Sequence, residues 1–300
     1  MPTNLPLFKY QKNPIFSIAF FIEKCYNKSI KQLILGGNGM DAKSTLLNEK
    51  INNASIVLGT LISLGHPAIT ECISEVGYDV IWIDMEHTAI DNESLLNNLI
   101  AARAGGTPAW VRLRWNDPVL AKPVLDMGAD GIIFPYVRTA EEAENAVKAC
   151  SYPPFGVRGY GPLRALRYGE IPQAEYVTET YKECKRIIQL EHIDAIENLR
   201  EIVKVEGIDG FIFGPNDLSG SLGLIGQVSH PECLKAYERG AEILRESGIP
   251  FGVATGSDPD WLSYWRGLGA TIFFSAADWN FVYSGATALL NGMRNTFTEK

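Results

Sequence analysis

Short apolar runs and longer segments of helical periodicity alternate along the chain from about residue 54 onward. The apolar runs lack the in–out alternation of a half-exposed strand, which is typical of strands buried on both faces of a parallel sheet. Strands are predicted for residues 56–62, 80–84, 109–114, 131–136, 186–190, 210–214, 250–254 and 271–275.

Apolar residues recur every three or four positions in the segments between these runs, which predicts helices. The clearest such segments are residues 92–104, 140–149, 193–203 and 231–247. Eight strand units separated by helices, with no reversal of order, favour a closed (β/α)₈ TIM barrel in the α/β class. An open doubly wound sheet is the alternative. No glycine-rich phosphate-binding motif follows a strand, which disfavours nicotinamide-dinucleotide and P-loop chemistry.

The first forty residues differ from the rest. Residues 15–22 are apolar and lie between basic residues and Glu23, but no small-residue cleavage site follows. The run is too short to span a bilayer. We predict that residues 1–40 form a poorly ordered or peripheral N-terminal extension, with a targeting segment or a packed accessory element as alternatives. A helix start near Asp41 places the barrel domain at residues 41–300.

Composition narrows the function classes. A length of 300 residues suits one barrel, and 46% apolar residues provide a large core. The net charge of −8, without a basic cluster, argues against binding to nucleic acid. The five cysteines are scattered and form no C-x-x-C pair, which predicts reduced thiols in a cytoplasmic protein that does not enter the membrane.

Two carboxylates follow neighbouring predicted strands. Glu191 ends the fifth strand and Asp217 follows the sixth. Strand C-termini carry the chemistry of barrel enzymes, and two acidic oxygens there suit Mg²⁺ or Mn²⁺. The alternative is that Glu191 pairs with a basic residue and Asp217 caps a helix that begins at Leu218.

Two further polar side chains stand at predicted strand ends. His87 follows the second strand, and histidine is the usual proton carrier near neutral pH. A satisfied surface or core histidine is the alternative. Arg112 lies on the third strand, between Val111 and Leu113, and is predicted to point into the barrel. It then needs either an anionic ligand or a structural acid.

These motifs together resemble those of a known family. From about residue 54 to 290 the chain is similar to the metal-dependent pyruvate-class aldolases of the HpcH/HpaI aldolase and citrate lyase superfamily. The matching motifs lie, in the family's order, at residues 83–87, 111–118, 125–129, 152–159, 189–191 and 214–219. The first fifty residues are outside the resemblance.

The resemblance implies a role for each matching residue. Glu191 and Asp217 are expected to bind a divalent cation, Mg²⁺, Mn²⁺ or Co²⁺. Arg112 is expected to stabilise an enolate, and His87 to transfer protons together with Asp126. Substrate-binding positions are expected at Gln189, Gly214 and Asn216.

The predicted activity is a carbon–carbon lyase that cleaves a 4-hydroxy-2-oxo acid to pyruvate and an aldehyde. The same site would serve an oxaloacetate decarboxylase or an enolate-using enzyme like macrophomate synthase. A barrel that binds a 2-oxo acid without catalysis is the third hypothesis. The expected partners are a small 2-oxo acid and an aldehyde. No lysine that could form a Schiff base stands at these predicted strand ends, although Lys122 follows the third strand.

Residues away from the strand ends bear on the identity of the substrate and on assembly. Residues 155–169 contain Arg158, Arg164 and Arg167 and form either a lid over the substrate or a packing surface. His192 and residues 160–165 depart from the expected family pattern, so the resemblance does not define the aldehyde. The resemblance also implies a homo-oligomer that exchanges its last helix, for which residues 283–293 are the candidate.

Overall fold

The computed structural model describes residues 39–298, with side chains for residues 43–297. Apart from its last two residues, the extension predicted for residues 1–40 lies outside the described residues. The chain from Lys43 onward forms one compact unit.

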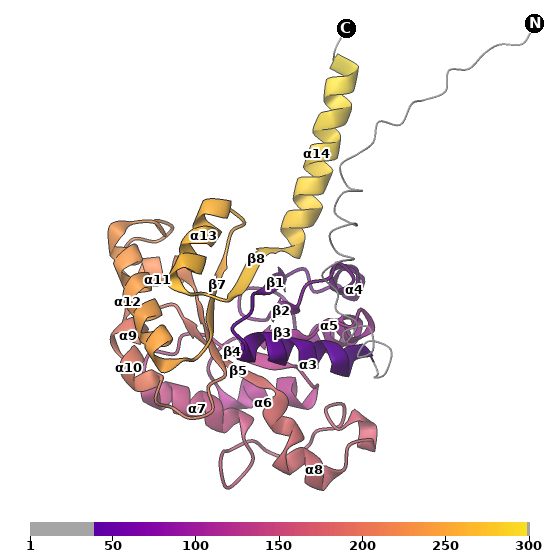
Figure 1. The fold of residues 1–300 in the computed structure, drawn as a ribbon. Helices are drawn as coiled ribbons and strands as arrows, with labels where there is room; N and C mark the ends of the chain where they lie inside the picture. The colour runs from indigo at the N-terminus through magenta and orange to yellow at the C-terminus, as the bar shows by residue number, and fades with distance from the viewer. Residues whose placement is uncertain (1–38, 299–300) are drawn as a thin grey trace, which may run out of the picture. The chain divides into compact units, whose positions relative to one another are not determined.

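Eight parallel strands close into a barrel in sequence order, with β1 paired to both β2 and β8 (Figure 1). This confirms the predicted (β/α)₈ TIM barrel and excludes the open sheet. The strands are β1 Val57–Ile62, β2 Val80–Asp84, β3 Ala109–Arg112, β4 Gly131–Phe134, β5 Lys185–Leu190, β6 Gly210–Phe213, β7 Phe251–Thr255 and β8 Ile272–Ala277.

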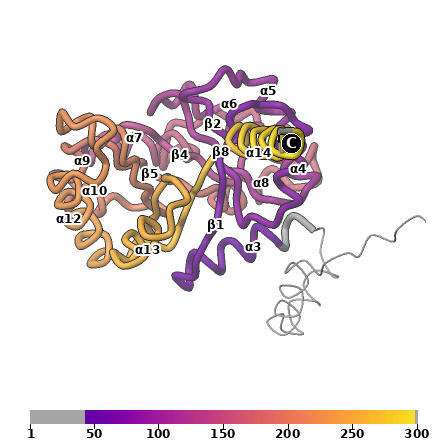
Figure 2. Tube along the Cα trace, turned by 90° about the horizontal axis from the view of Figure 1, so that it is seen from above, coloured from indigo at the N-terminus to yellow at the C-terminus, as the bar shows by residue number. Residues whose placement is uncertain are grey.

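Helices fill the connections and lie around the strands (Figure 2). They are α3 Gly39–Asn52, α4 Pro67–Ser74, α5 Asn92–Ala104, α6 Pro118–Asp126, α7 Ala140–Cys150, α8 Gln173–Thr178, α9 Ile193–Glu197, α10 Leu199–Ile202, α11 Pro215–Ser221, α12 Pro231–Ser247, α13 Pro259–Leu268 and α14 Asp278–Thr298, with 3₁₀ turns η1 Arg167–Gly169 and η2 Thr180–Glu183.

Several predicted element boundaries differ from the structure, and two of the differences have identifiable reasons. The fourth strand stops at Phe134 rather than residue 136, because Tyr136 has a φ of 55°, a left-handed conformation that does not occur in a strand. The helix predicted for residues 193–203 is split at Asn198, which ends α9 and begins α10. The Asn198 side chain makes no capping bond to α10 and donates to the carbonyl of Arg138.

The barrel interior is filled from its N-terminal end. Leu47 and Ile51 of α3 are buried in one cluster with Val57 and Val80, the first residues of β1 and β2. The same cluster contains the inward-facing residues Trp82, Trp110, Ile133, Ile187, Ile212, Ile272 and Phe274. The apolar side chains of α3 close the N-terminal end of the barrel. The interior can therefore open only at the opposite end, where the strands have their C-termini.

Glycine makes this packing fit at one point. A Cβ atom at Gly59 would lie 2.4 Å from the ring of Phe274, so only glycine lets that ring fill the space beside β1. The ring in turn meets Trp82 edge to face at a centroid distance of 5.2 Å.

Helix α14 leaves the barrel after β8 (Figure 1). Its side chains from 281 to 297 are exposed, including the apolar Leu289, Leu290, Met293 and Phe297. The exchanged segment predicted for residues 283–293 lies within this helix. Its first residue, Asp278, is fully buried and accepts hydrogen bonds from the backbone N–H groups of Ser63 and Leu64, both 2.9 Å long, which hold the helix start against β1.

Four cysteines fall within the described residues, Cys72, Cys150, Cys184 and Cys233, and all four are free. In the same part of the chain, no helix combines the length and apolar character that crossing a bilayer requires.

The closure of the N-terminal mouth predicts a stability effect. Leu47→Ala should lower the free energy of unfolding by about 2–4 kcal/mol, because it removes a buried side chain and leaves a cavity under the barrel. Glu49→Ala, on the exposed side of the same helix, is the control and should change it by less than about 0.5 kcal/mol. Urea denaturation followed by circular dichroism measures both, and equal effects would show that α3 does not close the barrel.

Candidate active site

A cavity of about 290 Å³ opens at the carboxyl end of the barrel. Its wall collects residues from the ends of β2, β3, β5 and β6, together with β1, β7, β8 and the start of α14. Six predicted site residues line it: His87, Arg112, Gln189, Gly214, Asn216 and Asp217. Strand-end position predicted His87, Arg112 and Asp217, and the family resemblance added Gln189, Gly214 and Asn216.

Glu191 lies beneath this cavity with only 1% of its surface exposed. Its Oε1 accepts a 2.7 Å hydrogen bond from the backbone N–H of Tyr136. Burial, the nearby charge of Glu86 and, less strongly, that of Asp217 raise the pKa of Glu191 to about 8, against the opposing effects of the Tyr136 amide and Arg112. No salt bridge to Glu191 occurs among the described residues, so the predicted alternative of a simple ion pair does not hold.

Asp217 stands in the first turn of α11. The helix begins at Pro215, and its N-cap is Gly214, which makes no side-chain capping bond. The alternative that Asp217 caps a helix starting at Leu218 is therefore wrong. Its carboxylate is part of the wall of the cavity.

Gly214 fits tightly between the two strand ends. A Cβ atom there would lie 2.9 Å from Nε2 of Gln189 and 3.1 Å from Oε2 of Glu191. A larger residue would push against the ends of both side chains. Glycine therefore leaves Gln189 and Glu191 in place where β6 approaches the end of β5.

Arg112 is held by carboxylates on two sides. Its Nε and Nη2 donate to the two oxygens of Asp84 at 2.8 and 2.7 Å, and its Nη1 lies 3.0 Å from Oε2 of Glu86. Nη1 also donates to Oε1 of Gln189 at 3.5 Å, toward the cavity. Burial alone lowers the pKa of Arg112, but the two carboxylates outweigh it and keep the pKa above its ordinary value. Arg112 therefore pairs with the acidic residues Asp84 and Glu86, as the alternative predicted, and it also lines the cavity.

Glu86 connects this pair to His87. Its Oε2 is buried without a hydrogen bond of good geometry, although it lies 3.8 Å from Nε2 of His87 as well as close to Arg112. Burial raises the pKa of Glu86, while Arg112 and His87 oppose that rise. The His87 side chain is 63% exposed at the mouth of the cavity, where it can meet a ligand.

Asp126 and His87 of the same chain do not lie near each other. Asp126 is the last residue of α6, which runs back from the carboxyl end of β3 toward the start of β4, so the two residues lie at opposite ends of the barrel. There its Oδ1 accepts a 2.8 Å bond from Nη2 of Arg158. Arg158 is enclosed by the rings of Tyr152 and Tyr176.

Residues 155–169 do not cover the cavity in a single chain. Arg158 is bound to Asp126, and Arg164 donates to the carbonyl groups of Met127 and Leu99. These contacts match the predicted alternative of a packing surface rather than a lid. His192 caps α9, since its Nδ1 accepts from the N–H of Asp194 at 3.2 Å.

Sequence reasoning missed several residues around the cavity. The backbone of Tyr136 contacts Glu191, but only its positive φ aims that N–H at the carboxylate, and no sequence signal gave this conformation. Asp84 and Glu86 stood in the strand-end motif and could have been assigned to Arg112. Thr255 and Asn280 line the cavity from β7 and α14.

Two carboxylates of the site suit a divalent cation. Glu191 keeps Oε2 next to the space that a Cβ at Gly214 would fill, and Asp217 adds a second carboxylate at the cavity wall. Carboxylate oxygens are the ligands that Mg²⁺ and Mn²⁺ prefer. Among the side chains of residues 43–297, no group of three or more acidic, histidine or cysteine residues is positioned to hold a metal ion.

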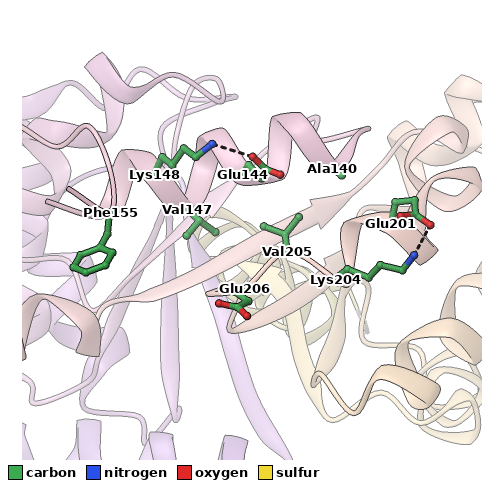
Figure 3. A pocket seen from close by; sticks show the side chains of 9 residues that line it. All are labelled: Ala140, Glu144, Val147, Lys148, Phe155, Glu201, Lys204, Val205 and Glu206. Carbon is green, nitrogen blue, oxygen red and sulfur yellow. Dashed lines mark hydrogen bonds and ion pairs between the residues drawn. The ribbon is translucent and has the colours of Figure 1, made fainter. Parts of the chain in front are cut away.

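A second hollow, of about 410 Å³, lies on the outside of the barrel between α7 and the segment after α10 (Figure 3). Four of its five charged side chains are paired within the wall, Lys148 with Glu144 at 2.9 Å and Lys204 with Glu201 at 2.6 Å. It contains none of the strand-end residues. The carboxyl-end cavity is therefore the candidate active site.

Comparison with known proteins agrees with this geometry. The HpcH/HpaI aldolase/citrate lyase family matches residues 58–273. The chain is 35% identical over 234 residues to 4-hydroxy-2-oxo-heptane-1,7-dioate aldolase of Salmonella paratyphi C, covering 77% of this chain and 88% of that one. It is 40% identical over 191 residues to hydroxypyruvate/pyruvate aldolase of Sagittula stellata, covering 63% and 75%.

Solved structures show the same relationship. The HpcH/HpaI aldolase of Desulfitobacterium hafniense superposes with a TM-score of 0.75 at 31% identity, over 84% of this chain and 96% of that one. The chain therefore belongs to the HpcH/HpaI aldolase/citrate lyase family. This confirms the resemblance and the prediction of a carbon–carbon lyase.

The Asp84–Arg112 pair generates a prediction about stability. Arg112→Ala should lower the free energy of unfolding by about 3–5 kcal/mol, because it leaves a buried Asp84 carboxylate uncompensated. Arg200→Ala breaks an exposed pair with Glu246 and should cost less than about 1 kcal/mol. Urea denaturation measures both, and similar small losses would mean that Asp84 does not depend on Arg112.

Proposed function

We propose that this family member is a divalent-metal-dependent aldolase that cleaves a 4-hydroxy-2-oxo acid to pyruvate and an aldehyde, or joins them in reverse. The main support is the position of Glu191 and Asp217 directly after neighbouring strands. Asp217 lines the cavity together with Arg112 and Gln189, and Glu191 lies beneath it. The names of the relatives support the substrate class.

Glu191 and Asp217 are the residues that would hold the cation. When bound, a divalent cation lowers the energy of the negative charge that develops on the keto oxygen of a 2-oxo acid. A bound cation would offset the burial and the neighbouring negative charges that raise the pKa of Glu191 to about 8.

Arg112 and its neighbours bind and orient the 2-oxo acid in this proposal. The Nη1 of Arg112 faces the cavity, while Asp84 fixes the other side of the guanidinium and so sets its direction. A fixed positive charge beside the keto oxygen stabilises the enolate without reorganisation. Gln189 and the backbone of residues 214–216 hold the substrate carboxylate.

The bond changes require one base. In cleavage, the 4-hydroxyl group loses its proton to His87, the C3–C4 bond breaks, and its electron pair forms the enolate of pyruvate. The same protonated imidazole then returns a proton to C3. Glu86 Oε2 lies 3.8 Å from Nε2 of His87, beside the imidazole that exchanges the proton.

Asp126 takes part only if a second copy of the chain supplies it. Within one chain it is at the other end of the barrel from His87, whereas its Oδ2 is not committed to Arg158. The exposed apolar side of α14 offers a surface for such an assembly, since a row of uncovered leucine and phenylalanine side chains is unfavourable in water. We therefore propose a homo-oligomer in which Asp126 of one copy orients His87 of another.

The metal-dependent activity has a direct test. With Mg²⁺ or Mn²⁺, the wild type should release pyruvate from a 4-hydroxy-2-oxo acid faster than from oxaloacetate, and chelation should abolish both. Glu191→Gln and Asp217→Asn should lower kcat/KM at least about 100-fold and weaken Mn²⁺ binding in calorimetry. Asp260→Asn makes the same charge change at an exposed position and should leave both values unchanged.

Full activity after chelation would contradict the metal site. Faster turnover of oxaloacetate, with no cleavage of any hydroxy acid, would identify a decarboxylase instead. Metal and pyruvate binding without turnover would identify the non-catalytic barrel.

Coexpression tests the proposed sharing of Asp126. His87→Ala and Asp126→Asn should each lower kcat/KM by about 10²- to 10⁴-fold. When the two variants are coexpressed and copurified, about a quarter of the sites should be intact, since each site draws each residue independently from the two chains. Activity no higher than that of either variant alone would show that His87 and Asp126 do not work together across copies.

A further inference from the structure

The candidate active site has two chemically different halves. The half described above is charged and carries the proposed cation ligands. The other half comes from the ends of β1, β7 and β8 and the first turn of α14, and consists of Leu61, Ala254, Thr255, Ala276, Ala277 and Asn280. If pyruvate occupies the charged half, the aldehyde must lie in this second half.

Asn280 presents hydrogen-bond donors to the cavity. Its Oδ1 accepts a 3.0 Å bond from the backbone N–H of Ala277, which assigns the amide orientation and uses the acceptor. The two Nδ2–H groups have no partner among the described residues. Asp278, anchored by Ser63 and Leu64, fixes the turn that carries Asn280.

Thr255 presents a donor for the same reason. Its Oγ1 accepts a 2.8 Å bond from Nε1 of Trp261. Trp261 is in turn stacked on Tyr264, with ring centroids 5.0 Å apart and planes 8° apart, so the accepting contact is held in place. The Thr255 hydroxyl hydrogen is left to donate to a ligand.

We propose that Thr255 and Asn280 form a donor pair that selects an aldehyde with a neutral oxygen substituent, such as a hydroxyl on the carbon next to the carbonyl. This inference rests on the proposed aldolase function. Two neutral donors in an otherwise apolar wall match a hydroxyl oxygen, which accepts hydrogen bonds without carrying charge. Leu61 and the alanines contact the short carbon chain.

The charges of the site favour a neutral aldehyde over a carboxylate-bearing one. Asp84, Glu86, Glu191 and Asp217 surround this end of the barrel, and Arg112 is already paired with the first two. A second substrate carboxylate would meet this negative field while its own partners are neutral amide and hydroxyl groups.

The test uses aldol addition of pyruvate to three aldehydes. Glycolaldehyde and propanal have nearly the same shape but exchange a hydroxyl for a methyl group, and 4-oxobutanoate carries a terminal carboxylate. The wild type should use glycolaldehyde with a kcat/KM at least about tenfold above that for propanal, and above that for 4-oxobutanoate.

Variants separate the pocket from the intrinsic reactivity of the aldehydes. Asn280→Asp keeps the oxygen that accepts from Ala277 but removes the donors, and Thr255→Val removes the hydroxyl that Thr255→Ser retains. The glycolaldehyde-to-propanal ratio of kcat/KM should fall about tenfold in Asn280→Asp and in Thr255→Val and be kept in Thr255→Ser. Because the ratio is taken within each variant, a general loss of activity cancels.

The outcomes distinguish a failure of the donor pair from a failure of the proposed aldolase function. An unchanged ratio in both Asn280→Asp and Thr255→Val, or a preference for 4-oxobutanoate over glycolaldehyde, would overturn the donor pair while leaving the aldolase function intact. If no aldehyde adds to pyruvate with either metal ion, the proposed function itself fails and the donor pair fails with it.

Discussion

The crowding of four carboxylates around one guanidinium at the carboxyl end of the barrel is the constraint on which the site depends. Arg112 is tied to Asp84 and Glu86, which leaves Glu191 buried beside further negative charge. In water such a group of acids would simply ionise, but here burial and mutual repulsion raise the pKa of Glu191 to about 8. A divalent cation would offset much of this excess negative charge.

The fold creates this constraint by making the two ends of the barrel unlike. At the N-terminal end, α3 inserts Leu47 and Ile51 among the first residues of the strands and excludes polar groups. At the other end, the strands finish in charged and amide side chains instead of apolar ones, and Gly214 lets β6 approach β5 within contact distance of Gln189 and Glu191. The cavity is therefore a consequence of which residues end each strand.

The fold and the charged half of the site could be predicted from the sequence because both depend on local patterns. Apolar runs gave the strands, and a carboxylate, an arginine or a histidine at the end of a run gave Glu191, Asp217, Arg112 and His87. What depends on backbone geometry could not be predicted: the left-handed Tyr136 that aims its N–H at Glu191, and the turn that brings Asn280 from α14 into the cavity. The place of Asp126 was also not predictable, since motif order gives no distance along the barrel axis.

The central claim is that this end of the barrel stabilises the enolate of pyruvate with the help of a cation held by Glu191 and Asp217. Exchange of the pyruvate methyl protons for deuterium, followed by proton NMR in D₂O, measures enolate formation without any aldehyde. We expect the methyl protons of pyruvate to exchange only when both the protein and Mg²⁺ are present, and this exchange to be lost in Glu191→Gln. Exchange that continues at the same rate in excess chelator, or that is absent with every divalent cation, would contradict the central claim.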